Sequence, residues 1–212
     1  MSGNLSERVL VHRRTICGLA LVLGAVACMP LPALTAAEVL RTTITVRVYQ
    51  SAGLPLRLEQ QALAEAETVL GAALVDVGWR ECTGPHRATV CDVPPGPSEL
   101  SLRIVREGAP RHDARATLGD AFVDRRAGWV LATVYFDHVA ALAKVAGTDV
   151  AVLLGRAVAH ELGHLLMRTP THARRGLMRP SWTLGELRGN RAADWVFTTG
   201  DVAAMHQPGS SD

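Results

Sequence analysis

Apolar and polar residues alternate with a period of two along several short stretches of the chain, and this pattern predicts β-strands. The clearest stretches are TTITVRVYQ and ELSLRIVRE, which place aliphatic or aromatic side chains at every second position. Two further apolar runs are separated by a tight turn at 125–128. The predicted strands are 42–50, 75–82, 99–107, 121–124 and 129–136.

Elsewhere the apolar positions recur at helical spacing. Residues 56–74 are rich in helix formers and predict an amphipathic helix. A short helix should begin at Asp137 as its N-cap and end at Gly147, and Asp149 should cap a longer helix through VAVLLGRAVAHELGHLLM. Helical stretches are also expected at 183–195 and 201–206. This order of elements predicts an α+β fold.

The first 37 residues have the layout of a secretory signal peptide. A basic start with three arginines precedes an apolar run at 16–29, two prolines interrupt it, and small residues at 35–37 resemble a cleavage site. We therefore expect the mature chain to begin near Glu38 and to be secreted or periplasmic. The polar residues 207–212 predict a flexible tail.

Three alternatives for this leader stay open. Residues 16–34 nearly reach the roughly 20 residues that a membrane-spanning helix needs, so the leader could be retained as an anchor. Cys28 could be a lipidation site, and the pair Arg13-Arg14 could mark twin-arginine export. We expect contact with a membrane only through the leader, if it is left uncleaved or lipidated.

Setting the leader aside changes the charge and the cysteine count. It holds three of the 22 basic and one of the 20 acidic residues, so 19 of each remain and the net charge is near zero. Nucleic-acid binding, which needs a basic face, is not expected. Cys82 and Cys91 are the cysteines that remain. An even count in an exported chain favours a disulfide between them over free thiols or metal ligands.

The longest predicted helix carries the candidate chemistry. It contains the sequence His160-Glu161-Leu162-Gly163-His164. Histidines four residues apart lie on one face of a helix, about 5–6 Å apart at Cβ, so both imidazoles can bind one ion. Glu161 is well placed to take a proton from water on that ion. The pattern is short, and a helix with histidines that bind no metal remains the alternative.

This stretch resembles the zincin metallopeptidases, and the metzincin group in particular, over residues 157–182. Metzincins continue from HExxH to a third histidine and later place a methionine in a turn beneath the metal. The resemblance implies that His160, His164 and His172 bind Zn²⁺, that Glu161 is the general base and that Met178 lies in the methionine turn. It also implies a zincin-like fold over residues 38–206: a mixed, twisted sheet packed on helices, with HExxH on the active-site helix.

The spacing departs from the usual metzincin pattern. The third histidine usually follows the second by six residues, but that position is Pro170, which we expect to end the helix, and His172 follows His164 by eight. Glu186 is the rival third ligand, because another zincin branch takes a glutamate from a later helix. Pro180 stands where some metzincins carry a tyrosine near the metal.

The resemblance implies a secreted zinc endopeptidase, acting on peptides or proteins as a monomer. Its substrate should pair with an edge strand, for which 129–136 is the candidate. The alternative is an inactive zincin-like binding domain with a stabilising zinc. We expect His138 at the surface, and Trp182 and Trp195 in the core of a small C-terminal lobe. The arginines expected to solvate the loop after the metal-binding helix are Arg168, Arg174, Arg175 and Arg179.

Overall fold

The structure is a computed structural model that describes residues 41–84, 87–96, 99–106, 117–123 and 130–207, all within the unit Val39–Asp212. The expected leader, the turn at 125–128 and residues 208–212 of the tail lie outside these residues. The elements are β1 (Thr42–Gln50), α1 (Leu56–Ala72), β2 (Val75–Glu81), η1 (Thr89–Asp92), β3 (Glu99–Val105), β4 (Gly119–Val123), β5 (Val130–Tyr135), α2 (Phe136–Ala146), α3 (Val150–Met167), α4 (Leu184–Gly189), η2 (Ala192–Asp194) and α5 (Thr199–Met205).

The five strands form one mixed sheet in the order β2-β1-β3-β5-β4. The first four strands of this order are parallel neighbours, whereas β4 runs antiparallel to β5. The five predicted strands and the expected mixed sheet packed on helices are therefore confirmed. The expected edge strand is not: β5 lies between β3 and β4, so the terminal strand on this side is β4.

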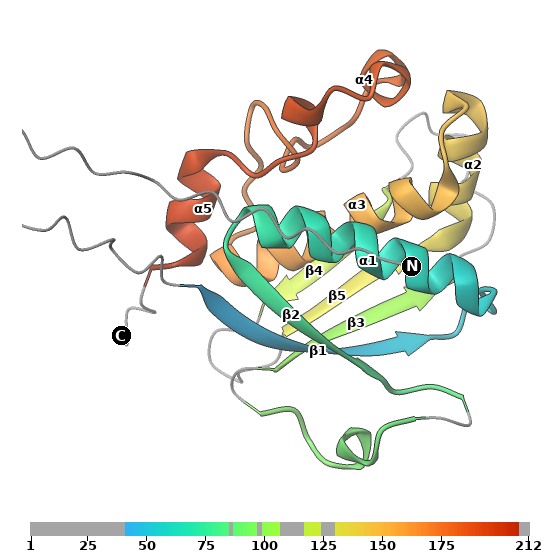
Figure 1. Ribbon diagram of the computed structural model, residues 1–212, viewed down its shortest axis with the longest axis vertical. Helices are drawn as coiled ribbons and strands as arrows, with labels where there is room; N and C mark the ends of the chain where they lie inside the picture. Colours follow the sequence, from blue (N-terminus) through green and yellow to red (C-terminus); the bar gives the residue numbers. More distant parts are fainter. Residues whose placement is uncertain (1–40, 85–86, 97–98, 107–116, 124–129, 208–212) are drawn as a thin grey trace, which may run out of the picture. The chain divides into compact units, whose positions relative to one another are not determined.

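Helices α1 and α3 lie side by side on one face of the sheet (Figure 1). The core lies between these helices and the strands, where Val46, Leu102 and Val134 are fully buried. The two helices approach closely because residue 155 is a glycine. A Cβ atom there would lie 2.4 Å from the carbonyl oxygen of Ala62 on α1. Any larger side chain would push the helices apart.

The ends of the helices follow the predicted capping signals in part. The Asp149 side chain accepts hydrogen bonds from the backbone of residues 151 and 152, and Gly147 ends α2 in the left-handed conformation, with φ 69°. Asp137 is not the N-cap of α2, because the helix begins one residue earlier and Tyr135 takes that position. Pro170 does not end α3 either, since the helix already ends at Met167.

The loop after β2 covers part of the opposite face of the sheet. Cys82 and Cys91 are joined by the predicted disulfide, with their Cα atoms 5.6 Å apart. The Arg47 side chain is 1% exposed beneath this loop. Its guanidinium donates to the backbone oxygen of Val93 at 2.6 Å and to Glu99 at 2.5 Å. The loop therefore covers a buried cation whose charge is paired.

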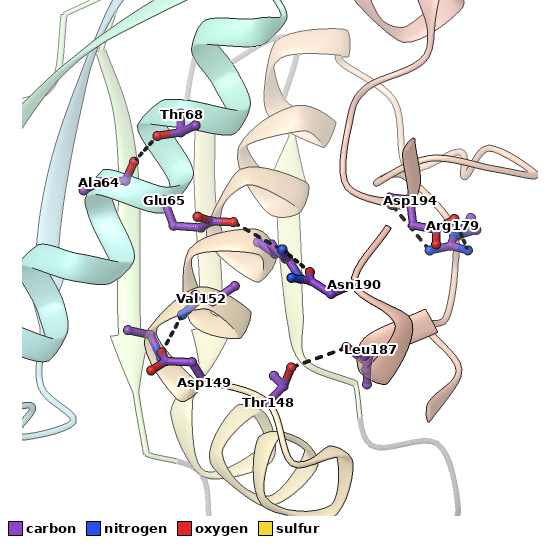
Figure 2. Close-up of polar contacts among 12 residues, drawn as sticks. Ala64, Glu65, Thr68, Thr148, Asp149, Val152, Arg179, Leu187, Asn190 and Asp194 are labelled. Atoms are coloured by element: carbon purple, nitrogen blue, oxygen red, sulfur yellow. Dashed lines mark hydrogen bonds and ion pairs between the residues drawn. The ribbon is translucent and has the colours of Figure 1, made fainter. Parts of the chain in front are cut away.

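Arg156 ties the C-terminal segment to α3. Its guanidinium donates to Glu65 of α1 at 3.2 Å and to the side chain of Asn190 at 2.7 Å. It also lies 4.1 Å from the centroid of the Trp195 ring. Glu65 and Asn190 come from opposite sides of α3 (Figure 2). Leu177, Met178, Leu187 and Phe197 join the same hydrophobic core, and a separate C-terminal lobe stays a prediction.

Helix α3 is long and apolar enough to cross a membrane by length and composition, but 78% of that stretch is buried inside the protein. Burial of this extent is typical of a core helix in a folded domain. Its apolar sequence is thus explained by packing against the sheet and α1.

Candidate metal centre

Helix α3 brings together the two histidines and the glutamate of the HExxH sequence. His160, Glu161 and His164 are 7%, 6% and 5% exposed, so all three are polar groups inside the apolar core helix. Buried polar groups are costly unless they are hydrogen-bonded or bind an ion. Their partners therefore indicate what each side chain can do.

Backbone carbonyls hold the two helix histidines by their Nδ1 atoms. His160 Nδ1 lies 3.0 Å from the oxygen of Leu177, and His164 Nδ1 lies 2.8 Å from the oxygen of Thr169. A carbonyl only accepts, so Nδ1 must carry the proton and Nε2 keeps a lone pair. The two Nε2 atoms lie 3.1 Å apart. Two nitrogens bound to one tetrahedral Zn²⁺ are about 3.3 Å apart, which is close to this separation.

The segment after α3 brings His172 to the same point. Arg168 adopts a left-handed conformation, with φ 54°, and turns the chain back towards the helix. The His172 ring centroid then lies 5.3 Å from that of His160 and 4.7 Å from that of His164. One donor atom from each of the three histidines lies within 4.8 Å of the other two. His172 itself is exposed.

Burial keeps these imidazoles neutral. The pKa of His160 is lowered to about 4, mainly by burial; the hydrogen bond to Leu177 opposes this shift, and the neighbouring histidines add to it. Burial also lowers the pKa of His164 and of His172. A metal ligand must be the neutral imidazole, so the site is ready to bind a cation without first losing protons.

Glu161 projects from α3 against the terminal strand β4. A Cβ atom at Gly119 would lie 2.7 Å from Glu161 Cγ and 2.8 Å from its Oε1, so only glycine leaves room for this carboxyl. The Glu161 pKa is raised to about 8, mainly by burial and to a smaller extent by the negative charge of Asp120. The carboxyl therefore lies between the helix and the strand, against the backbone of Gly119.

Met178 lies under α3 at the end of a tight turn. Gly176 has φ 76°, and the Ala173 N–H donates to the Met178 oxygen at 2.8 Å to close the turn. Met178 is fully buried, and a Cβ atom at Gly163 of α3 would lie 2.8 Å from its sulfur. The glycine of the HELGH sequence therefore lets the methionine pack directly against the helix between the two histidines.

Glu186, the rival ligand, has other partners. Its carboxylate accepts from the Thr183 backbone N–H at 2.7 Å, which forms a capping box at the start of α4, and makes an ion pair with Arg179. The sequence analysis expected Arg179 to solvate the loop, but its side chain is buried. Among the described residues, the histidine cluster is the group of possible ligands close enough to share an ion, and Glu186 is not part of it.

Several residues near the site carry no signal in the sequence pattern. Trp182 donates to the Leu177 oxygen at 3.2 Å, the carbonyl that also holds His160, and its ring lies edge-on to that histidine. His138 is buried rather than at the surface, with Nδ1 2.7 Å from the Thr117 oxygen. The negative charge of Asp120 acts on Glu161 only because the fold packs β4 against α3. Each of these contacts depends on tertiary structure that local spacing does not contain.

The donor set fits zinc. Three neutral imidazoles with converging lone pairs are ligands that Zn²⁺ prefers, and three protein ligands are typical of a catalytic rather than a structural zinc site. A structural site usually has four ligands, often cysteines, whereas both cysteines here are joined to each other. His160, His164 and His172 are thus the residues that would hold the ion.

Comparison with known proteins bears on the fold. The sequence matches no protein-family model and no curated protein. The structure is similar to that of a zinc-dependent peptidase from Methanocorpusculum labreanum (strain Z), with a TM-score of 0.50 and 16% sequence identity. The similarity covers 76% of this chain and 99% of that one. At this level of identity, the likeness shows that the two proteins share a fold, here a five-stranded mixed sheet packed on helices.

Proposed function

We propose that this protein is an exported, zinc-dependent endopeptidase of the metzincin-like type. The observation that carries the proposal is the convergence of His160, His164 and His172 beside the buried carboxyl of Glu161. The shared fold with a zinc-dependent peptidase supports it. Peptides or proteins are the proposed substrates, and a monomer is the proposed state.

Each residue of the site has a chemical role in this proposal. His160, His164 and His172 would hold a Zn²⁺ ion, which would supply Lewis-acid chemistry for the activation of water near neutral pH and for the polarisation of a substrate carbonyl. Glu161 accepts the proton of the attacking water and then passes it to the leaving amine. A carboxyl whose pKa is raised to about 8 before metal binding can carry that proton, and a nearby cation favours the ionised form that accepts it.

The proposed position of the substrate is along β4. This strand pairs with β5 on one side, and its Gly119 backbone packs against Glu161. An extended peptide that adds to the other side of β4 would gain main-chain hydrogen bonds and would lie next to the base. β4 thus takes the role that the sequence had assigned to residues 129–136.

An inactive binding domain with a stabilising zinc is the second candidate. The observation in its favour is the exposed position of His172, on a turn two residues longer than in most metzincins. Such a domain would bind zinc through the same histidines but would leave peptides intact. The two candidates differ only in hydrolysis, so one variant decides between them.

Substitution of Glu161 by glutamine is that variant. We expect Glu161→Gln to keep one zinc per chain, because the three ligands are unchanged, while peptide hydrolysis falls about 10²- to 10⁴-fold through loss of the base. The measurements are zinc content by atomic absorption and cleavage of a mixed peptide library, with and without a chelator. Glu67→Gln, at an exposed position on α1, is the matched control and should retain full activity.

Two results would contradict this proposal. Hydrolysis that survives in Glu161→Gln would exclude the assigned base. A zinc-loaded wild-type protein that cleaves no peptide in the library would favour the inactive binding domain instead.

A further inference from the structure

The Leu177 carbonyl, which holds His160, accepts a second hydrogen bond. His160 Nδ1 lies 3.0 Å from this oxygen, and the indole N–H of Trp182 donates to it at 3.2 Å. A carbonyl oxygen has two lone pairs, so these two donors use its whole capacity. Leu177 is fully buried, so water does not replace either donor. The direction of this carbonyl therefore depends on Trp182 as well as on His160.

Trp182 also contacts the His160 ring directly. The two ring centroids lie 5.8 Å apart, and the ring planes meet at 82°. This edge-to-face arrangement is one that aromatic pairs prefer. The direct contact and the shared carbonyl together restrict rotation of the imidazole. They thereby set the direction of Nε2, which is the atom that would bind the ion.

A second tryptophan fixes the position of Trp182 relative to α3. Trp195 is 4% exposed and packs edge-on against Trp182, with the ring centroids 5.3 Å apart. The Arg156 guanidinium lies 4.1 Å from the centroid of the Trp195 ring. Arg156 and His160 are four residues apart on α3 and so share one face of the helix. The contacts thus run from α3 through two indole rings and back to the same helix.

The two tryptophans differ in the partners of their N–H groups. Trp182 donates to Leu177, whereas the buried Nε1 of Trp195 has no hydrogen-bond partner among the described residues. Both rings contribute to the same packing. Only Trp182 can act on His160 through a hydrogen bond, so the pair allows positioning to be separated from packing.

Resting on the function proposed above, we propose that Trp182 is a positioning residue for the zinc ligand His160. Its N–H fixes the Leu177 carbonyl, this carbonyl fixes the protonated Nδ1, and Nε2 is thereby directed at the ion. Groups that orient a metal ligand in this way typically contribute about 10- to 100-fold to metal affinity or activity. Trp182 acts only through His160 and does not itself bind the ion.

The test compares Trp182→Phe with Trp195→Phe in the full chain. Each variant replaces an indole by a smaller ring in the same aromatic pair, so both should lower the free energy of unfolding of the metal-free protein. We expect Trp182→Phe to weaken zinc binding about tenfold, because the Leu177 carbonyl loses a donor. Trp195→Phe is the matched control and should bind zinc with an affinity close to that of the wild type. The affinity is measured by competition with a chelator.

Substitution of zinc by cobalt gives a readout that a loss of packing alone would not change. The visible absorption bands of Co²⁺ depend on the arrangement of its ligands. Trp182→Phe should shift these bands relative to the wild type, because the His160 ring is no longer held in one orientation. Trp195→Phe should keep the spectrum of the wild type.

The outcomes distinguish this inference from the function on which it rests. Wild-type zinc affinity and an unchanged Co²⁺ spectrum in Trp182→Phe would overturn the inference and leave the peptidase function intact. Equal losses of affinity in the two variants would assign the effect to packing and would overturn it as well. A wild type that binds zinc but cleaves no peptide would contradict the peptidase function, while the two variants would still decide the inference. Failure of the wild type to bind zinc would overturn both.

Discussion

His172 is held differently from the other two histidines of the centre. Backbone carbonyls fix the rings of His160 and His164 through Nδ1, and both side chains are buried in α3. His172 comes from the turn that follows the helix and is exposed. Its proposed role as a ligand is therefore the one that most needs a direct test.

Metal content provides that test at the scale of single residues. We expect His172→Ala to lose stoichiometric zinc, because a direct ligand is removed, whereas Glu186→Ala retains it. Loss of the Glu186 side chain should instead lower stability by about 0.5–2 kcal/mol, as the capping box of α4 is lost. The measurements are zinc per chain after dialysis and urea unfolding of each variant. The reverse pattern of zinc content would make Glu186 the third ligand.

The sequence predicted those parts of the candidate metal centre that depend only on the spacing of residues within one helix. Two histidines one helical turn apart share a face in any helix, so His160 and His164 follow from the pattern alone. The position of His172 depends on the left-handed turn at Arg168, which replaced the expected end at Pro170. Asp120 lies on β4, and only the tertiary fold packs this strand against Glu161.

At the scale of elements, strands and helices were predicted well because each has one buried face with its own period. The order of the strands in the sheet was not predicted, because it is a property of the whole sheet. The sequence predicted residues 129–136 as an edge strand from their place in the chain, but β5 pairs with β3 on one side and with β4 on the other. The tightest contact between α1 and α3 similarly depends on Gly155, which a helical pattern would have tolerated but not required.

A buried carboxyl where α1 meets the ends of β1 and β2 gives the fold a pH dependence. The Glu59 pKa is raised from its ordinary value of 4.5 to about 7, mainly by burial and also by a hydrogen bond with Glu81 and by the negative charge of Glu81. A raised pKa in the folded state means that the protonated form is stabilised. The stabilisation is complete below about pH 4.5 and is lost as the pH rises towards 7.

Glu59→Gln mimics the protonated carboxyl at every pH. We expect the wild type to lose stability relative to this variant between pH 4.5 and about 7, with a constant difference at higher pH. The measurement is the free energy of unfolding in urea at several pH values, with the disulfide oxidised. Glu67→Gln on the same helix should follow the wild type. Parallel pH profiles for the wild type and Glu59→Gln would contradict the assignment.

At the scale of the whole molecule, the proposed export links the leader to the disulfide. If residues 1–37 direct export, N-terminal sequencing of the secreted protein should begin near Glu38. Mass spectrometry without reduction should find Cys82 and Cys91 joined, because the disulfide needs an oxidising compartment. Full-length protein recovered from the cytoplasm with both thiols free would contradict the localisation.

The order of the strands also has a kinetic consequence. Parallel neighbours cannot be joined by tight hairpins. β1 therefore pairs with β2 only after the chain has formed the crossover helix α1, and β5 pairs with β3 although β4 comes between them in the sequence. Pairings between residues distant in sequence close long loops before they gain contacts, and chains of this kind fold slowly. If the proposed leader directs export, slow folding would leave time to thread an unfolded polypeptide through a membrane channel. The sheet would then be completed only on the far side, where the cysteines can pair.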